Sequence, residues 1–177
     1  IENGSWGPEM DGSYQTFGPI WDYQQLAHKY SPVEDYVKDF FKTGINTNHS
    51  VSLSGMSDDT KMTYYLSYGY TYDNGILPGD NDTYNRNTIA YRGSYQATDW
   101  FKLSSNVNFA TASTNTVGSF QGASFIDGIL EFPRDMSLVD HKDLSNAFNT
   151  PEAWLTPYGI TNPYWAIENN YNHNDSK

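Results

Sequence analysis

The middle of the chain holds four runs in which apolar and small polar residues alternate, at positions 48–56, 61–72, 84–96 and 101–112. Side chains along a β-strand point to opposite faces in turn, so each run predicts a strand with two different faces. The more apolar faces carry Val51, Leu53, Met62, Leu66, Tyr68, Ile89, Tyr91, Leu103, Val107 and Phe109. None of the 21 acidic residues of the chain falls inside a run.

The composition of the opposite, polar faces separates a membrane strand from a strand of a soluble sandwich. These faces carry mostly Ser, Thr, Asn and Gly instead of the many charges expected of a water-facing sheet. Transmembrane β-barrels combine an apolar outer face, aromatic residues near both interfaces and a polar interior. A charge on the lipid side costs roughly 2–4 kcal/mol at the bilayer centre, which accounts for the missing acids. The pattern therefore favours an all-β fold, a fragment of a transmembrane antiparallel β-barrel, over a soluble β-sandwich.

The three links between the runs are short, long and short. The first and third are turns at 57–60 and 97–100, whereas the middle link, 73–83, is longer and rich in Gly, Pro, Asn and Asp. Such residues set turns and loops, and outer-membrane barrels have short periplasmic turns and longer extracellular loops. The sequence thus predicts an antiparallel meander with Asp58 and Asp99 on the periplasmic side.

The flanks of the strand block are irregular. The 177 residues suffice for one domain, but 1–47 and 113–177 show no sustained alternation, and we expect both to be long extracellular loops beside four barrel strands at 48–112. About eight strands are the practical minimum for a closed barrel. We therefore expect the chain to be a piece of a longer polypeptide.

One short amphipathic helix is predicted near 32–43. Ser31 can cap it, Pro32 suits the first helical position, and Glu34 completes a capping box. The residues that then share one face are Val33, Val37, Phe40 and Phe41. We expect this helix to pack on the wall or rim of the barrel, although a core helix of a soluble domain fits the spacing equally well.

Charge and composition exclude several classes of function. The net charge is −11 and the pI is near 4.5, which argues against nucleic-acid binding, since that needs a basic patch. The absence of cysteine excludes disulfides and cysteine-ligated metals. No stretch approaches the ~20 apolar residues of a membrane helix.

Motifs of enzymatic or metal chemistry are missing from the sequence. The four histidines are in no metal-binding spacing, and 80–82 only faintly resembles a calcium loop, without its Gly and terminal Glu. There is no Gly-rich phosphate loop and no Gly-x-Ser-x-Gly elbow. The sequence does not decide whether two carboxylates form a glycoside-hydrolysing pair, because such a pair is defined by the distance between the two groups in the folded protein. We expect no enzyme activity, no catalytic residue, no metal and no cofactor.

A set of short motifs in sequence order carries a resemblance to a known family. They are Gly4-Ser5-Trp6-Gly7-Pro8, Met10-Asp11-Gly12, Val37-Lys38-Asp39-Phe40-Phe41 with Gly44, the strand Asn48 to Gly55, Asn74-Gly75-Ile76-Leu77-Pro78, Arg86-Asn87, Pro133-Arg134-Asp135 and Asn162-Pro163-Tyr164-Trp165. The set resembles the SusC/RagA family of TonB-dependent outer-membrane transporters of Bacteroidetes, over nearly the whole chain.

The resemblance implies a bacterial outer-membrane barrel of 22 strands with an N-terminal plug domain, which is absent from this chain. It implies active import of a large nutrient, a glycan or a peptide, with energy transmitted by the TonB complex. The expected partners are a SusD-like surface lipoprotein that forms a lid, the outer-membrane lipid and the ligand, with no nucleic acid among them.

Two groups of residues are candidates for contacts in such a transporter. Tryptophans of the flanks could touch ligand or lipoprotein, with packing of the loops as the alternative: Trp6, Trp21, Trp154 and Trp165. Polar residues of the strands could face the lumen and line the plug interface or the passage, with generic filling of the lumen as the alternative: Arg92, Gln96, Asn106 and Asn108.

A second class of function also fits the abundance of Trp and Tyr and the low charge of the strands. It is a secreted, β-rich carbohydrate-binding module or a glycosidase fragment. This alternative predicts a soluble monomer in which the apolar strand faces are covered by a second layer of protein.

Overall fold

The computed structural model describes residues 7–118, 124–155 and 160–177. It is mostly β, with 48% strand and 12% helix, arranged as two antiparallel sheets and two α-helices. The chain divides into two compact units. We call them the core unit (Ile1–Thr43, Ile76–Asn81 and Val117–Asn172) and the sheet unit (Gly44–Gly75, Asp82–Thr116 and His173–Lys177).

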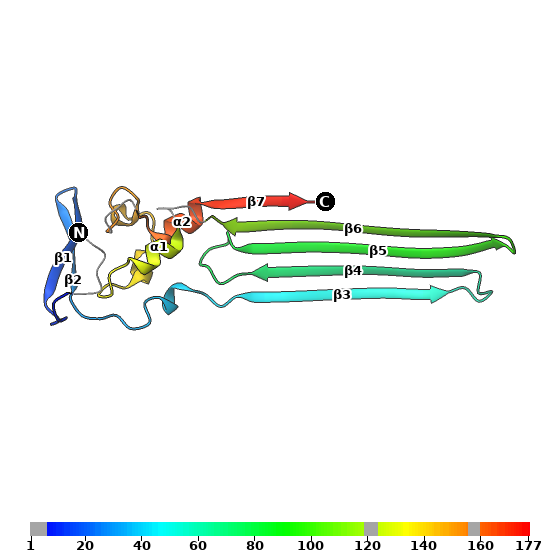
Figure 1. Cartoon of the computed structure of the whole chain (residues 1–177), viewed down its shortest axis with the longest axis horizontal. Coiled ribbons are helices and arrows are strands. Elements are labelled where there is room, and N and C mark those ends of the chain that lie inside the picture. Colours follow the sequence, from blue (N-terminus) through cyan, green and yellow to red (C-terminus); the bar gives the residue numbers. More distant parts are fainter. Residues whose placement is uncertain (1–6, 119–123, 156–159) are drawn as a thin grey trace. The chain divides into compact units, whose positions relative to one another are not determined.

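The sheet unit is a single antiparallel sheet in which neighbours in the sequence are neighbours in space (Figure 1). Its strands are β3 (Ile45–Met56), β4 (Met62–Asn74), β5 (Thr83–Thr98), β6 (Phe101–Val117) and β7 (Tyr171–Ser176). The predicted meander of four strands is confirmed, and so is the short, long, short order of its links.

The four meander strands are longer than their sequence runs. They contain 12, 13, 16 and 17 residues, whereas strands of globular proteins usually have 3–10. The boundaries predicted at 48 and 112 are therefore wrong by several residues. β3 begins at Ile45 and β6 continues to Val117, because residues beyond the alternating runs still pair, as in Asn46 with Asp73 and Thr83 with Asn115.

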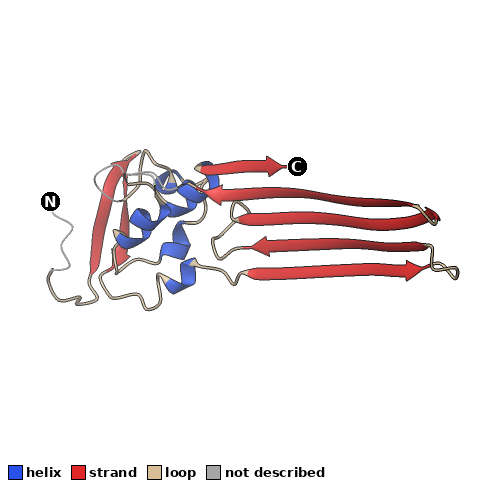
Figure 2. Cartoon of the chain, turned by 45° about the vertical axis from the view of Figure 1, so that its right-hand side comes forward, coloured by secondary structure: helices blue, strands red, loops and turns tan. Residues whose placement is uncertain are grey.

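The core unit contains the helices and a separate hairpin (Figure 2). Its elements are β1 (Tyr14–Trp21), β2 (Gln24–Lys29), the short 3₁₀ helices η1 (Lys38–Phe40), η2 (Leu138–His141) and η3 (Ala147–Asn149), and the α-helices α1 (Phe125–Leu130) and α2 (Pro163–Asn169). The hairpin turns at Asp22 and Tyr23, both with positive φ, as a two-residue type I′ turn requires.

The core unit has the only hydrophobic core found in the described residues. Its members come from segments far apart in the sequence: Phe40, Leu77, Ile129, Phe132, Met136, Leu138, Trp154, Leu155 and Ile167. Within this unit, the His28 ring of the hairpin contacts the Asp135 carboxylate, and both side chains are almost buried. The described parts of 1–47 and 113–177, which the sequence assigns to long extracellular loops, contain the β1–β2 hairpin, α1 and α2 and share this core. Their extracellular position stays a prediction.

The helix predicted for 32–43 is also wrong in extent, because only η1 forms there. The Val33 N–H donates to the carbonyl of Arg134 at 2.9 Å, in place of a capping box. Asp35 has φ +54°, which breaks the helical path. The apolar spacing instead places Phe40 in the core, with its ring 4.8 Å from that of Tyr164. The alternative of packing inside a protein core describes this segment better than packing on a barrel wall.

Asn162 holds three segments of the core unit together. It is fully buried, and its Nδ2 donates to the carbonyls of His141 and Asn149, each at 2.9 Å. Its Oδ1 accepts from the Tyr164 N–H at 2.9 Å and so caps α2, which starts with Pro163 at a favoured position. The Asn-Pro-Tyr-Trp motif therefore has a structural explanation.

We predict that Asn162→Asp destabilises the core unit by about 3 kcal/mol, because a carboxylate keeps the cap but faces two carbonyls without a donor. Cleavage within 124–155 by limited proteolysis, measured against urea concentration, reports the loss. Asn146→Asp is the matched control, since Asn146 caps η3 with its side-chain oxygen alone. Equal stability of the two variants would contradict the role assigned to Asn162.

The buried ring of His141 makes the core unit sensitive to acid. His141 is 8% exposed, and its Nδ1 lies 2.7 Å from the Asn149 Oδ1. Burial lowers the pKa of His141 from its ordinary value of 6.5. The unfolded chain then binds the proton first, so the stability contributed by neutral His141 is complete above pH 6.5 and falls as pH drops toward the lowered pKa.

We predict that His141→Gln flattens the decline in stability of the core unit below pH 6.5. The same proteolysis assay at pH 7.5 and pH 5 measures the slope, with wild type as reference. A variant whose loss of stability between these values equals that of wild type would show that His141 is not the titrating group.

Candidate functional site: the two faces of the long-stranded sheet

The sheet unit buries none of its residues. Large apolar side chains stay open along the middle of its strands, with exposed fractions of 65% at Val51, 46% at Leu66, 44% at Ile89 and 53% at Val107. Apolar residues with no protein cover are unfavourable in water. These side chains therefore require an apolar surrounding that the described chain does not supply.

The strand register gathers the apolar residues into continuous rows across one face, which we call the apolar face. Its two central rows are Leu53, Leu66, Tyr91, Val107 and Val51, Tyr68, Ile89, Phe109. Three further rows lie toward the short turns. The first is Gly55, Tyr64, Gly93 and Ser105, the second is Met62, Tyr95 and Leu103, and Phe101 comes last. None of these positions carries a charge, so the whole band suits contact with hydrocarbon.

The height of this band agrees with a membrane. Nine residues run from Phe101 to Phe109 along β6, about 27 Å at ~3.4 Å per step, and a tilted transmembrane β-strand needs about 9–11 residues. Beyond Phe109 the same face becomes polar, with Asn87 and Thr111 in one row. The strands thus continue past the band toward the end where the longer link joins β4 to β5.

Three tyrosine hydroxyls on the apolar face point away from the centre of the band. The Tyr68 hydroxyl donates to Asn87 Oδ1 at 2.7 Å and the Tyr70 hydroxyl to Asn85 Oδ1 at 3.2 Å, toward the longer link. Tyr91, from the central rows, instead reaches over Gly93 toward the short turns.

Strand direction explains this divergence. Side chains in strands lean along the strand, and β4 and β5 are antiparallel, so Tyr68 and Tyr70 lean toward the opposite end of the sheet from Tyr91. An amphipathic ring that keeps its body in hydrocarbon and its hydroxyl in a polar layer needs this arrangement. Tyr64 differs, since its hydroxyl lies beside Gly55 in its own row.

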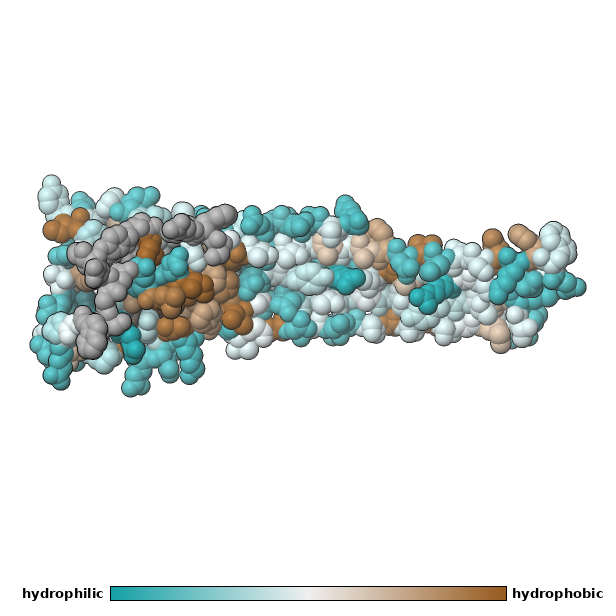
Figure 3. Space-filling model, viewed as in Figure 1, coloured by the Kyte–Doolittle hydropathy of each residue, from teal (hydrophilic) through white to brown (hydrophobic). Residues whose placement is uncertain are grey.

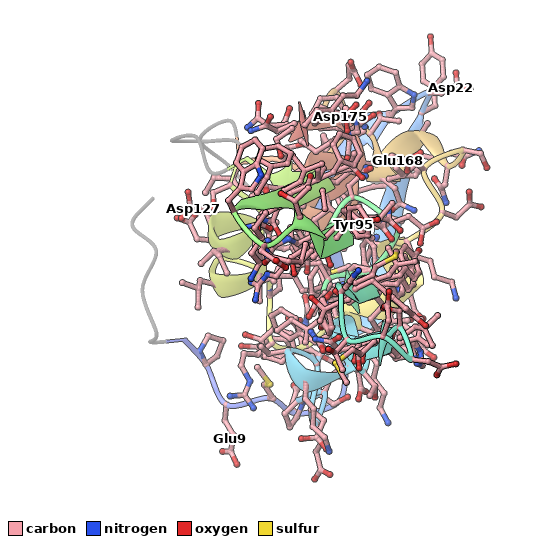
Figure 4. The ribbon with its side chains drawn as sticks, turned by 90° about the vertical axis from the view of Figure 1, so that its right-hand side faces the viewer. Glu9, Asp22, Tyr95, Asp127, Glu168 and Asp175 are labelled. Carbon is pink, nitrogen blue, oxygen red and sulfur yellow. The ribbon has the colours of Figure 1, made fainter. Side chains whose placement is uncertain are left out.

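The opposite, polar face brings the four sequence-predicted lumen candidates together. Arg92 lies opposite Asn106, Gln96 opposite Lys102, and Asn108 opposite Ala90. All share one face with rows of Ser, Thr and Ala. In Figure 4 the view runs along the strands, so side chains extend to both sides of the sheet, with Tyr95 marking β5.

The four tryptophan candidates have different surroundings. Trp154 is buried and stacks on Phe132 at 5.8 Å, so it serves packing and the proposed contact with ligand or lipoprotein is wrong for this residue. Trp21 is 42% exposed beside the hairpin turn, and Trp165 is partly exposed on α2. Trp6 lies outside the described residues.

A polar hollow in the core unit was not predicted. It encloses about 510 Å³ and is lined by Pro78, Gly79, Asp80, Asn81, Lys142, Tyr164, Ile167 and Glu168. Asn81 Nδ2 donates to the carbonyls of Ile167 and Glu168, each at 3.2 Å, and burial raises the pKa of Tyr164 to about 12. In Figure 4 Glu168 and Asp127 lie on opposite sides of this unit. No spacing in the sequence connects these positions, so only the fold reveals the hollow.

The core unit and the sheet unit also differ in the hydropathy of their visible surfaces. In Figure 3 brown, apolar residues gather in the core unit, while the visible side of the sheet unit is mostly pale and teal. Fixed charge follows the same division: the core unit has 15 acidic and five basic residues, and the sheet unit has six and five. Almost the whole negative charge of the chain belongs to the core unit.

Comparisons with known proteins add no relative. No protein-family model matches the chain, and no curated protein matches its sequence. Within the described residues, no group of three or more His, Cys, Asp or Glu side chains is placed to hold a metal ion.

None of the helices in the described part of the chain is both long and apolar enough to cross a membrane.

Proposed function

We propose that the sheet unit is a section of the wall of an outer-membrane β-barrel, and that the core unit is formed by its extracellular loops. The barrel belongs to an active transporter that imports a large nutrient, a glycan or a peptide. A plug driven by the TonB complex and a SusD-like lipoprotein lid complete this proposal. It rests on the ordered motifs described above, and no enzyme activity is part of it.

One observation carries the proposal: no residue of a sheet of long strands is buried, and one of its faces is a charge-free apolar band about as long as a transmembrane strand. A soluble protein would cover this band with a second layer. Lipid can cover it without one, while a polar interior suits the opposite face. The diverging tyrosine hydroxyls support the same orientation.

The free edges of the sheet support closure by further strands. On one side β3 has no partner strand within the described residues, and on the other β7 covers only a six-residue part of β6. Long unpaired edges invite pairing, and barrels remove them by closing. The core unit, with its excess of acidic residues, has the composition of a water-exposed extracellular layer.

The secreted carbohydrate-binding module remains the second candidate because the polar hollow beside Tyr164 and Glu168 could accept a sugar. This candidate requires that the apolar face be covered by protein, and no described segment does so. The two candidate functions therefore differ in what covers the apolar face: lipid in the transporter and protein in the binding module.

We predict that Val107→Arg prevents assembly into the membrane, because a charge at the centre of the apolar face costs roughly 2–4 kcal/mol. The neighbouring Asn108→Arg is the matched control, since it places the same side chain on the polar face. Outer-membrane fractionation and heat-dependent gel migration measure the amount of assembled barrel.

The transporter proposal requires the Val107 variant to be depleted by at least about tenfold while the Asn108 variant stays near wild type. Equal assembly of both variants, or a wild-type chain that folds in buffer without detergent, would reject it in favour of the soluble module.

A further inference from the structure

We propose that the polar face of the sheet carries a subsite for a carboxylate-bearing saccharide, formed by Tyr65, Arg92 and Asn106. The inference deepens the proposed function, because it rests on this face being the interior surface of the transporter. It names the chemical class of one ligand that the interior would contact.

The register places the three residues in one row across the polar face. Tyr65 pairs with Arg92 across β4 and β5, and Arg92 pairs with Asn106 across β5 and β6. Directly opposed residues have Cβ atoms about 4.5–5.5 Å apart, so the row spans about 10 Å, near the width of one sugar ring with its substituents. Ser54, opposite Tyr65 on β3, extends the row with a hydroxyl group.

Arg92 is an unpaired cation within the described residues. Its guanidinium takes part in no ion pair, hydrogen bond or cation–π contact there. The nearest acid of the strands on this face is Asp73, which lies eight residues from Tyr65 along β4, or about 27 Å, and it accepts a hydrogen bond from Asn46. No described residue accepts from the five N–H donors of Arg92, and a guanidinium binds a carboxylate with two parallel hydrogen bonds.

Tyr65 is the only aromatic residue on the polar face between the row of Met56 and the row of Asn48. It is 37% exposed, and the adjoining row of the same face is made of Ser52, Ser67, Ala90 and Asn108. Three of these four side chains are small, which favours access of a sugar ring to Tyr65. Aromatic faces attract the partly positive C–H groups of a sugar, just as they attract the edge of another ring.

Asn106 supplies a hydrogen-bond donor to the proposed subsite. Asn108 Nδ2 donates to the Asn106 Oδ1 at 3.4 Å, which leaves the NH₂ group of Asn106 as a donor toward ligand hydroxyl groups. A saccharide fits this set better than a peptide. Peptides are recognised through strand edges or apolar grooves, whereas this subsite lies on the face of the sheet among hydroxyl and amide groups.

The test uses the full-length protein purified in detergent and isothermal titration calorimetry with four probes. Two are uronate oligomers, tetragalacturonate and tetramannuronate; the third is neutral maltotetraose and the fourth is tetraglutamate. We expect at least one uronate to bind about tenfold or more tightly than both maltotetraose and tetraglutamate, because only the uronates combine a carboxylate with a sugar ring.

Arg92→Gln is expected to weaken uronate binding by about tenfold or more, and Arg92→Lys to an intermediate degree, since Lys keeps the charge without the planar fork. Arg86→Gln is the matched control. Arg86 is an arginine of the same strand and face, but its row, Asn48, Thr71 and Ala112, has no aromatic residue. Its variant is expected to bind the uronate within about twofold of wild type.

Several outcomes would overturn the subsite. They are failure of both uronates to bind, tetraglutamate binding as tightly as the uronates, and an equal loss in the Arg86 and Arg92 variants, which would indicate diffuse electrostatic attraction. Heat-dependent gel migration of every variant keeps the two proposals distinguishable. An assembled barrel without uronate binding rejects the subsite alone, whereas binding by a chain that never assembles in a membrane rejects the transporter.

Discussion

The surroundings of the sheet, more than its internal contacts, determine this structure. Strands of 12 to 17 residues pair along their length within the sheet, but none of their residues is buried. A sheet in water normally gains its stability by packing one face on a core. Here that gain must come from two different surroundings, an apolar one for the rows around Leu66 and Val107 and a polar one for the rows around Arg92. Hydrocarbon outside and a wet interior satisfy both conditions at once.

On the apolar face, the direction of each strand and the position of a tyrosine along it decide where the tyrosine hydroxyl points. Tyrosines near the longer link lie mainly on β4, and a tyrosine of the central rows that reaches the other way, Tyr91, lies on the antiparallel β5. Each therefore leans outward from the middle of the band. The same alternation keeps Arg92 and Asn106 on the opposite face, so a shift of one residue in register would move charges into the apolar band. In the proposed membrane setting, the same alternation therefore fixes both the strand register and the face that contacts lipid.

The sequence predicted the sheet better than the core unit for a physical reason. Alternation with a period of two is a local signal, and the turn residues at 57–60 and 97–100 fix which positions face each other. The core unit has no such period. Phe40, Leu77, Leu138 and Trp154 meet only because distant segments pack together. The helix expected at 32–43 failed for the same reason, since a hydrogen bond from Val33 to Arg134 replaced a local cap.

The candidate site residues of the sheet could also be placed from the sequence, whereas those of the core unit could not. Arg92, Gln96, Asn106 and Asn108 share the polar face as their parity requires, whereas tryptophan content could not tell the buried Trp154 from the exposed Trp21. Alternation within 61–72 puts Tyr65 on the polar face, but its place opposite Arg92 follows only from the register. The polar hollow beside Glu168 had no signal in the sequence at all.

The most direct test of the central claim is a spin-label scan of residues 101 to 112 in the membrane-reconstituted protein, comparing collisions with oxygen and with a water-soluble nickel complex. The account predicts a period of two, with labels at 103, 107 and 109 accessible to oxygen and labels at 104, 106 and 108 accessible to nickel. Uniform accessibility to nickel, or protection of 103, 107 and 109 from both reagents, would contradict contact between the apolar face and lipid.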